Sequence, residues 1–513
     1  MLKTKLLYSA LSGLLLFLAF PPFNFFYLAF IALVPLIIVL DDAELKEVIL
    51  ISFVFTTVYT FGILTWIYIY NAVALPGMLI YMNFFYLIVF LLYYFISRRL
   101  YIIEIYVFPI VWVSIEYLRS ANKYGFPWGV VGYSQSSFIP FIQISDIISV
   151  FGISLLICYF NSIIAFLILT KFKSNRILIQ TVIVVIIFFI VFLYGFDKIE
   201  QYNNETDVRK LKVAVVQSNF SPYTMLWNKN RNEIINHIIN SVKNLSFNQP
   251  DIIILSESVI LDDLFNFNSK MENFVWKNFQ WKYYFSKYLY NSKSNIFFGT
   301  LTYRYLPDGD VQYFNSVFLL NNFGDILGSY DKIHLVPFGE FMPFSNIPAI
   351  KKMGEFFQCG NFSEGSKISL LETQTLKIAP LICYESIFHS LARNFAKLNP
   401  DVFINITNDA WTESSQAHYQ HFLMNVFTSI QNRIPLIRCG NSGISGYINE
   451  VGVISNQSIP FTKINYSFSI EFKPNFRGSF FARYGDLCPK IILILFGLLF
   501  LISFFFPKKN EYV

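Results

Sequence analysis

The chain alternates between long apolar runs and one long stretch of mixed polarity. A transmembrane helix needs about 20 mostly apolar residues, and eight stretches of the sequence have this character. They lie near residues 5–20, 26–40, 48–70, 75–97, 101–118, 147–170, 177–195 and 489–506. We therefore predict a membrane domain of seven transmembrane helices over residues 1–196, and an eighth transmembrane helix at 489–506.

The basic residues predict the orientation of these helices, because Lys and Arg in short loops favour the cytoplasm. With the N-terminus inside, the cytoplasmic loops contain Lys46, Arg98, Arg99, Lys171, Lys173, Arg176, Lys508 and Lys509. The short outer loops near 21–25 and 71–74 contain no Lys or Arg, and the outer loop at 119–146 contains Arg119 and Lys123. The polar stretch between the seventh and eighth helices is therefore predicted to lie outside the cytoplasm.

That polar stretch, residues 208–475, consists of short apolar runs that end at polar turns. Continuous apolar runs of this length are typical of strands buried on both faces. The runs are KVAVVQ, DIIILSE, NIFFGTL, NSVFLLN, LKIAPLIC, DVFINIT and PLIRC. Helical patterns at 228–244 and 415–432 lie between them, so we predict an α/β domain whose sheets are covered by helices.

Composition supports a membrane protein. The 513 residues are 55% hydrophobic and include 59 Phe and 32 Tyr, and the mean hydropathy of +0.48 exceeds that of ordinary soluble proteins. Lys3 and Lys5 precede the first apolar run as in a signal peptide, but no small-residue cleavage site follows, so we expect a retained helix. The net charge of +6 does not gather into a basic patch, and we expect no nucleic-acid partner.

Neither a metal nor a disulfide framework is expected. The five cysteines are few and dispersed, and none has zinc-ligand spacing. Whether Cys359, Cys439 or Cys488 pair is left open by the sequence. His418 and His421 are three residues apart on a predicted helix, but without an evident third ligand we expect them at the surface or supporting other groups.

Three segments carry a reactive side chain close to the end of an apolar run. DIIILSE ends on Glu257, LKIAPLIC ends on Cys383, and Lys332 lies in YDKIHLVPFGEFMPF. A thiol with an ordinary pKa of about 8.5 needs a base to become a nucleophile, and acyl transfer needs a positive or donor group beside the oxyanion. Taken singly, a cysteine of this kind is more often packed in the core, a lysine exposed in a turn and a glutamate solvated. Together, the three residues supply a nucleophile, a base and an oxyanion stabiliser.

The strings around these residues resemble the carbon-nitrogen hydrolase (nitrilase) superfamily and, within it, the apolipoprotein N-acyltransferase family. Their order is Glu257, YDKIHLVPFGEFMPF, LICYES and FINITNDAWTESSQAHYQH. In the predicted membrane regions, LAFPPFNFFYLAFIALVPL, IEYLRS, YGFPWGVVGYSQS and FARYGD are also similar to that family. The resemblance covers nearly the whole chain and implies that residues 208–475 form a nitrilase-like α-β-β-α sandwich.

The resemblance also implies a role for each matched residue. Glu257 would be the general base, Lys332 the oxyanion stabiliser and Cys383 the nucleophile that is acylated. The other matches are Glu340, a second carboxylate that positions the lysine, the supporting pair Tyr384 and Glu385, and Trp227 in the acceptor site. The sequence departs from the family at Ser256, where proline commonly precedes the base.

The function implied by the resemblance is acyl transfer at a bacterial cytoplasmic (inner) membrane, with the catalytic domain on the periplasmic side. The acyl donor would be a phospholipid and the intermediate a cysteine thioester. The acceptor would be the N-terminal amine of a diacylglyceryl-cysteine apolipoprotein. We expect a monomer that uses no cofactor.

Other functions use some of the same features. A membrane-tethered amidase or nitrilase would pass the acyl group to water with the same three residues, although a tether needs only one transmembrane helix. A transporter or receptor with an inactive outer domain would carry ionisable residues along its helices, where Glu104 and Glu116 are the few candidates. Within the site, a Cys-His dyad that uses His334 or His389 is an alternative to the glutamate base.

Overall fold

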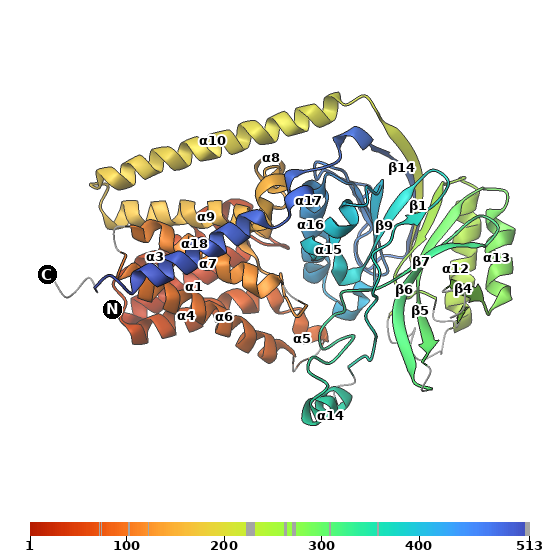
Figure 1. Cartoon of the computed structure of the whole chain (residues 1–513), viewed down its shortest axis with the longest axis horizontal. Coiled ribbons are helices and arrows are strands. Elements are labelled where there is room, and N and C mark those ends of the chain that lie inside the picture. The colour runs from red at the N-terminus through yellow and green to blue at the C-terminus, as the bar shows by residue number, and fades with distance from the viewer. Residues whose placement is uncertain are drawn as a thin grey trace. The chain divides into compact units, whose positions relative to one another are not determined.

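The computed structural model describes residues 1–70, 72, 74–100, 103–121, 123–221, 231–260, 264–268, 273–306, 309–356 and 359–507. The chain forms two compact units (Figure 1). The first unit comprises Met1–Asn204, Thr412–Gln431 and Ser479–Val513, and the second comprises Glu205–Trp411 and Asn432–Gly478. The segment Thr412–Gln431 thus clusters with the N-terminal helices, although its sequence lies inside the predicted polar domain.

The first unit is helical. Its elements are α1 (Leu2–Leu18), η1 (Phe26–Leu28), α2 (Ala29–Ala32), α3 (Val34–Asp41), α4 (Leu45–Leu64), α5 (Ile67–Tyr70), α6 (Ala74–Ser97), α7 (Glu104–Ser120), η3 (Val131–Gln135), α8 (Ile139–Ile142), α9 (Ser145–Leu169), α10 (Asn175–Asn204), α16 (Ser415–Asn432), α17 (Phe480–Tyr484) and α18 (Leu487–Ser503). Each of the eight predicted apolar stretches contains helix. Among the described residues, α4, α6, α9 and α10 are long and apolar enough to cross a membrane, and the total of eight transmembrane helices stays a prediction.

Apolar side chains on the outside of α10 suit a lipid environment. Only a small part of this helix is buried in the protein. The exposed side chains include Ile179, Val182, Val185, Ile186, Phe189 and Ile190. A contiguous apolar surface of this kind is unfavourable in water and marks contact with lipid or protein.

Two buried charged residues on α7 fix the segment that follows this helix. Glu116 accepts a hydrogen bond from the backbone N–H of Val131 at 2.9 Å. Arg119 donates to the carbonyls of Phe126 at 2.6 Å and Trp128 at 2.8 Å. Arg119 is in the last turn of α7 and not in the predicted outer loop. Its guanidinium satisfies backbone carbonyls that would otherwise lack partners. Glu116 likewise has a backbone-binding role.

The second unit contains two six-stranded sheets. The first has the order β14 (Ile464–Phe472), β1 (Arg209–Gln217), β2 (Ile252–Leu255), β5 (Asn295–Tyr305), β6 (Val311–Leu320) and β7 (Ile326–Asp331). The second has the order β13 (Ile454–Ser455), β12 (Gly446–Ile448), β11 (Leu436–Gly440), β10 (Val402–Thr407), β9 (Lys377–Ile382) and β8 (Leu371–Glu372). All seven apolar runs predicted as strands form β1, β2, β5, β6, β9, β10 and β11.

The two sheets pack face to face between helices, which confirms the predicted α-β-β-α class. Cys439 of β11 contacts the carbonyls of Val216 and Ile254 on the first sheet, both at 3.4 Å. On the other face of the first sheet lie α12 (Arg231–Ser246) and α13 (Phe279–Leu289), and α15 (His389–Ala396) lies beside the second sheet (Figure 1). The remaining elements are the hairpin β3 (Phe265–Asn268) and β4 (Asn273–Trp276), the helix α14 (Pro348–Phe356), and the short η4 (Cys383–Ile387), η5 (Asp409–Thr412) and η6 (Pro474–Phe476).

Strand direction explains how distant residues reach one place. Strand β2 is parallel to β1 and β5, and β9 is parallel to β10. Strand β7 runs antiparallel to β6, which itself runs antiparallel to β5, so β7 has the same direction as β5 and β2. The carboxyl ends of β2 and β7 therefore share one edge of the first sheet, where side chains that follow these strands can meet.

Candidate active site

The structure brings together the three residues that the sequence predicts as catalytic. Glu257 follows β2, Lys332 follows β7, and Cys383 follows β9 directly. Nζ of Lys332 lies 3.7 Å from Oε1 of Glu257, and the charges of both groups act on the Cys383 thiol. Lys332 and Glu257 are only 1% and 6% exposed, so these two groups are removed from bulk water and their electrostatic interaction is strong, while Cys383 is half-buried.

Cys383 occupies a strained turn. Its φ of 54° is in the left-handed region, which is uncommon for a residue other than Gly, Asn or Asp. The turn is held from both sides, since Asn405 donates to the carbonyl of Cys383 at 3.2 Å and the preceding N–H, that of Ile382, donates to Glu385 at 2.8 Å. Such strain persists only where the surroundings over-determine it, and it clusters at functional sites.

Glu257 and Glu340 are linked through an amide that the sequence prediction did not include. Nδ2 of Asn315 donates to Oε1 of Glu257 at 2.7 Å and to Oε1 of Glu340 at 3.1 Å. The second oxygen of Glu257 accepts the backbone N–H of Asn408 at 2.7 Å. Glu340 also accepts Nζ of Lys332 at 2.9 Å. The lysine therefore lies between two carboxylates whose positions are fixed by hydrogen bonds.

Burial and charge shift the pKa of each group in this cluster. Burial raises the pKa of Glu257, while Lys332 opposes that shift. Burial by itself would lower the pKa of Lys332, but the charges of Glu340 and Glu257 outweigh it and the pKa is raised. Burial and the charge of Glu257 raise the pKa of the Cys383 thiol, with Lys332 acting in the opposite direction. The resting state is therefore a neutral thiol beside a lysine ammonium, and a base is needed to form the thiolate.

Glu385 joins the cysteine turn to the lysine segment. Its Oε1 accepts the hydroxyl of Tyr330 at 2.8 Å and the N–H groups of Ile333 at 2.7 Å and His334 at 3.0 Å. Its Oε2 accepts the N–H of Ile382. One buried carboxylate thus bonds the residues that flank Lys332 and the residue before Cys383.

Comparison with known proteins covers nearly the whole chain. A family model described as apolipoprotein N-acyltransferase N-terminal domain matches residues 12–163, and one described as carbon-nitrogen hydrolase matches residues 212–463. An apolipoprotein N-acyltransferase from Geobacter metallireducens is 31% identical over 94% of this chain and 92% of its own length. The chain belongs to the apolipoprotein N-acyltransferase family. A member from Borreliella burgdorferi is 28% identical over 98% of this chain and 96% of its own length.

Among solved structures, a carbon-nitrogen hydrolase from Helicobacter pylori G27 is 14% identical, with a TM-score of 0.38, over 54% of this chain and 94% of its own. An amidase from Nesterenkonia sp. is 12% identical, with a TM-score of 0.36, over 52% of this chain and 91% of its own. Membership of the apolipoprotein N-acyltransferase family accounts for the first unit as well as the second, because the N-terminal family model lies within the helical region.

The remaining predicted residues have different fates in this family member. Tyr384 is buried, with its ring centroid 4.8 Å from that of Phe388. Trp227 lies outside the described residues. The hydroxyl of Ser256, where the family commonly has proline, is buried without a hydrogen-bond partner. Glu257 nevertheless makes the bonds given above.

The two histidines of the alternative Cys-His dyad lie in apolar or aromatic surroundings. Burial lowers the pKa of His389 to about 3, which makes it a weak base at neutral pH. The ring of His334 stacks on Phe388 with centroids 3.5 Å apart.

Of the two positions expected for His418 and His421, the surface is wrong, because both side chains are buried on α16, and a role in supporting other groups stays a prediction. Within the described residues, no group of three or more His, Cys, Asp or Glu side chains is arranged to hold a metal ion. The five cysteines, Cys158, Cys359, Cys383, Cys439 and Cys488, are all free.

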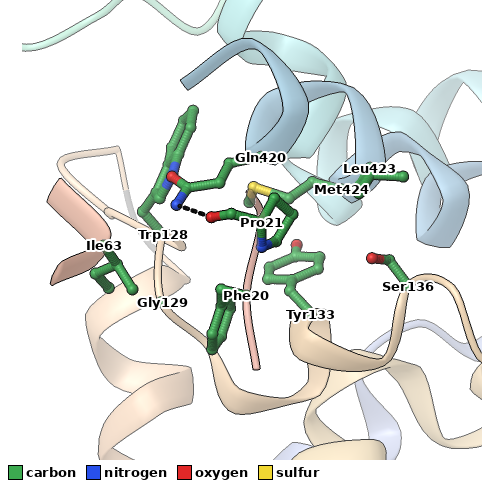
Figure 2. A pocket seen from close by; sticks show the side chains of 10 residues that line it. All are labelled: Phe20, Pro21, Ile63, Trp128, Gly129, Tyr133, Ser136, Gln420, Leu423 and Met424. Carbon is green, nitrogen blue, oxygen red and sulfur yellow. Dashed lines mark hydrogen bonds between the residues drawn. The ribbon is translucent and has the colours of Figure 1, made fainter. Parts of the chain in front are cut away.

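A small pocket in the first unit shows how α16 is attached to the N-terminal helices. Figure 2 shows Gln420 beside Trp128, with its amide directed at the carbonyl of Pro21. The amide nitrogen donates to that carbonyl at 3.1 Å, and the amide oxygen accepts the indole N–H of Trp128 at 2.7 Å and of Trp66 at 3.2 Å. Every polar atom of this buried side chain is therefore used, which explains why α16 belongs to the first unit.

Proposed function

We propose that this protein is an acyltransferase that moves a fatty acyl chain from a membrane phospholipid to the N-terminal amine of a diacylglyceryl-cysteine apolipoprotein. The observation that carries the proposal is the juxtaposition of a strained cysteine, a buried lysine and a buried glutamate in a member of the apolipoprotein N-acyltransferase family. In this proposal, Cys383 is the nucleophile, Glu257 the general base and Lys332 the oxyanion stabiliser.

The first half of the cycle loads the enzyme. The carboxylate of Glu257 takes the thiol proton as the sulfur of Cys383 attacks an ester carbonyl of the phospholipid. Negative charge develops on the carbonyl oxygen, where the Lys332 ammonium stabilises it. The carbon–oxygen bond of the ester then breaks, Glu257 returns the proton to the leaving hydroxyl, and a lysophospholipid departs. A thioester remains on the sulfur.

The second half of the cycle transfers the acyl chain. The free amine of the apolipoprotein attacks the thioester carbonyl and gives a proton to Glu257. The carbon–sulfur bond breaks, the proton returns to the sulfur of Cys383, and an amide leaves with the product. Because both substrates are lipids, the reaction needs a catalytic site that is open to the bilayer. The exposed apolar side chains of the first unit would hold the protein in that bilayer.

Supporting residues hold this machinery in place. We propose that Glu340 positions Lys332, that Glu385 and Tyr384 support the segments on either side of the nucleophile, and that Trp227 contributes to the acceptor site. We further propose that the protein acts as a monomer in a bacterial cytoplasmic membrane. Its domain at 208–475 would face the periplasm, with seven transmembrane helices within 1–196 and an eighth at 489–506.

The deciding experiment is mass analysis of the purified protein after exposure to phospholipid vesicles without an acceptor. The proposal predicts a gain of one acyl chain on the peptide that contains Cys383. The adduct should persist until a diacylglyceryl peptide with a free N-terminal amine is added, and an acetylated peptide should not discharge it. Cys383→Ala should remove the adduct, whereas the matched variant Cys359→Ala should keep it.

Two results would contradict the proposal. Rapid release of free fatty acid without acceptor would support the membrane-tethered amidase or nitrilase, since that enzyme uses water as its acceptor. An adduct on any cysteine other than Cys383 would overturn the assignment of the nucleophile.

A further inference from the structure

Arg438 is a charged residue in the middle of a buried strand. It lies on β11 opposite Asn405 of β10 and is fully buried. Nη2 of Arg438 lies 2.7 Å from Oδ2 of Asp409, and Nη1 donates to Oδ1 of Asn405 at 2.5 Å. Space for the aspartate depends on Gly443, where a Cβ would lie 2.1 Å from Oδ2. Burying a charge is unfavourable unless it is paired and hydrogen-bonded, and this arrangement meets both conditions.

Both partners of Arg438 connect to the turn that carries Cys383. Asn405 uses its amide nitrogen to hold the carbonyl of Cys383 at 3.2 Å. Asp409 accepts the hydroxyl of Thr407 at 2.8 Å, and Thr407 also hydrogen-bonds the Cys383 thiol. The guanidinium therefore reaches the cysteine by one route through the backbone and by another through the thiol.

Asp409, on the second route, also acts on the Cys383 thiol through its negative charge. The charged groups that act on the thiol of Cys383 are Glu257, Lys332 and Asp409. Burial and Glu257 raise the pKa of this thiol most, Lys332 lowers it, and Asp409 raises it further. Arg438 is the counter-ion of Asp409, so it offsets a negative charge that opposes thiolate formation.

We propose that Arg438 is a positioning residue for the nucleophile, which fixes the Cys383 turn through Asn405 and balances the charge beside the sulfur through Asp409. The inference rests on the proposed role of Cys383. Arg438 does not need to contact the substrate in this role, because its guanidinium is buried and bonded to protein groups.

The test compares Arg438→Gln, Asp409→Asn and the double variant in the full-length protein purified in detergent. The rate at which iodoacetamide alkylates Cys383 is followed against pH by mass analysis. Arg438→Gln leaves the aspartate without its cation, so the profile should move to higher pH. Asp409→Asn leaves the arginine without its anion, so the profile should move to lower pH. Each shift should be about 1–3 pH units, and the double variant should lie between the single variants.

Opposite shifts of the two pH profiles distinguish this proposal from a purely structural role, because loosened packing would shift the profiles of both single variants in the same direction. A shift in the same direction, or none, would overturn the inference. If Arg438→Gln does not fold, Asp409→Asn still decides, since an unchanged profile or a move to higher pH contradicts the charge-balancing role.

Two controls complete the experiment. Arg433→Gln removes another buried arginine of the second unit, one that bonds the carbonyl of Glu450 at 3.3 Å, and should leave the profile unchanged. Asn405→Ala keeps all charges, so it should leave the profile in place while slowing acylation by phosphatidylethanolamine about 10²-fold through misplacement of the turn. Wild-type protein that gains no acyl group on Cys383 would refute the proposed function, whereas the alkylation profiles report on the arginine network independently.

Discussion

Lys332 and Glu340 form an ion pair between residues eight positions apart, with Nζ of the lysine 2.9 Å from Oε1 of the glutamate. The same ammonium is 3.7 Å from Glu257. The lysine is therefore held mainly by the carboxylate that the proposed cycle does not use as a base. This unequal sharing keeps the ammonium beside the thiol and leaves the Glu257 carboxylate available to accept a proton.

Glu340→Gln should slow acylation and change its pH dependence. Without the second carboxylate, the ammonium is expected to move toward Glu257, and a displacement of about 1 Å can cost about 10²-fold in rate. The charge of Glu340 contributes to the raised pKa of Glu257. Its removal should lower that pKa, so the acid limb of the acylation rate should move to lower pH. Single-turnover acylation measured from pH 4 to 8 checks both effects.

The matched control for this prediction is Glu372→Gln, which changes an exposed glutamate on β8 of the same unit. It should leave both the rate and the acid limb unchanged. An acid limb that moves to higher pH in Glu340→Gln would contradict the charge relationship described here.

Lys332→Ala should reduce the rate of acylation by about 10²- to 10³-fold, the usual effect of losing one oxyanion donor. It also leaves the carboxylates of Glu257 and Glu340 without the cation between them, so the pKa of Glu257 should rise and the remaining activity should need a higher pH. Lys367→Ala, at an exposed position of the same unit, is the control. Near-normal turnover of Lys332→Ala would instead direct attention to His334 or His389.

The sequence predicts those parts of the site that follow apolar strands. Glu257 and Cys383 end runs that are apolar because both faces of each strand are buried, and Lys332 lies in a distinctive turn string. Strand β14 is not predicted from a continuous apolar run, because its residues alternate between exposed and buried positions at the edge of a sheet. A period of two residues, rather than a continuous apolar run, is the signal that reveals it.

Other parts of the site depend on pairing that no local pattern specifies. Arg438 lies in the apolar run PLIRC, and the strand prediction gives this buried charge no role. Its importance follows from the register that sets it opposite Asn405. Asn315 similarly gains its role by bridging two carboxylates from separate segments. Long-range register thus decides which polar residues in a buried strand belong to the site.

Glu385→Gln should weaken both the fold and the reaction. The carboxylate accepts four hydrogen bonds, and a glutamine amide has only one oxygen to replace two. The best rotamer keeps the three bonds near Lys332 and loses the one from Ile382, leaving a buried N–H without its partner at a cost of about 1–3 kcal/mol. Acylation should slow as the Cys383 turn loosens, and the melting temperature in detergent should fall.

The stability difference between wild type and Glu385→Gln should also depend on pH. Burial raises the pKa of Glu385 from 4.5 to about 7 in the folded protein. Because its pKa is higher in the folded than in the unfolded protein, protonation of Glu385 stabilises the fold. This stabilisation is fully present below pH 4.5 and is lost as pH rises through 7. The variant lacks this titration, so the wild-type advantage should narrow between pH 5 and pH 8. Thermal unfolding at the two pH values checks the sign, and a widening difference would contradict it.

The orientation of the protein can be tested with two exposed lysines predicted to lie on opposite sides of the membrane. Lys367 is in the second unit, and Lys173 is between α9 and α10. Each is replaced by cysteine in a background where the half-buried Cys359, Cys383 and Cys488 are alanine. Because basic residues in short loops favour the cytoplasm, a membrane-impermeant maleimide applied to intact spheroplasts should label Lys367→Cys and spare Lys173→Cys until the cells are permeabilised. The reverse labelling would refute a periplasmic site and, with it, access to a lipoprotein acceptor on that side of the membrane.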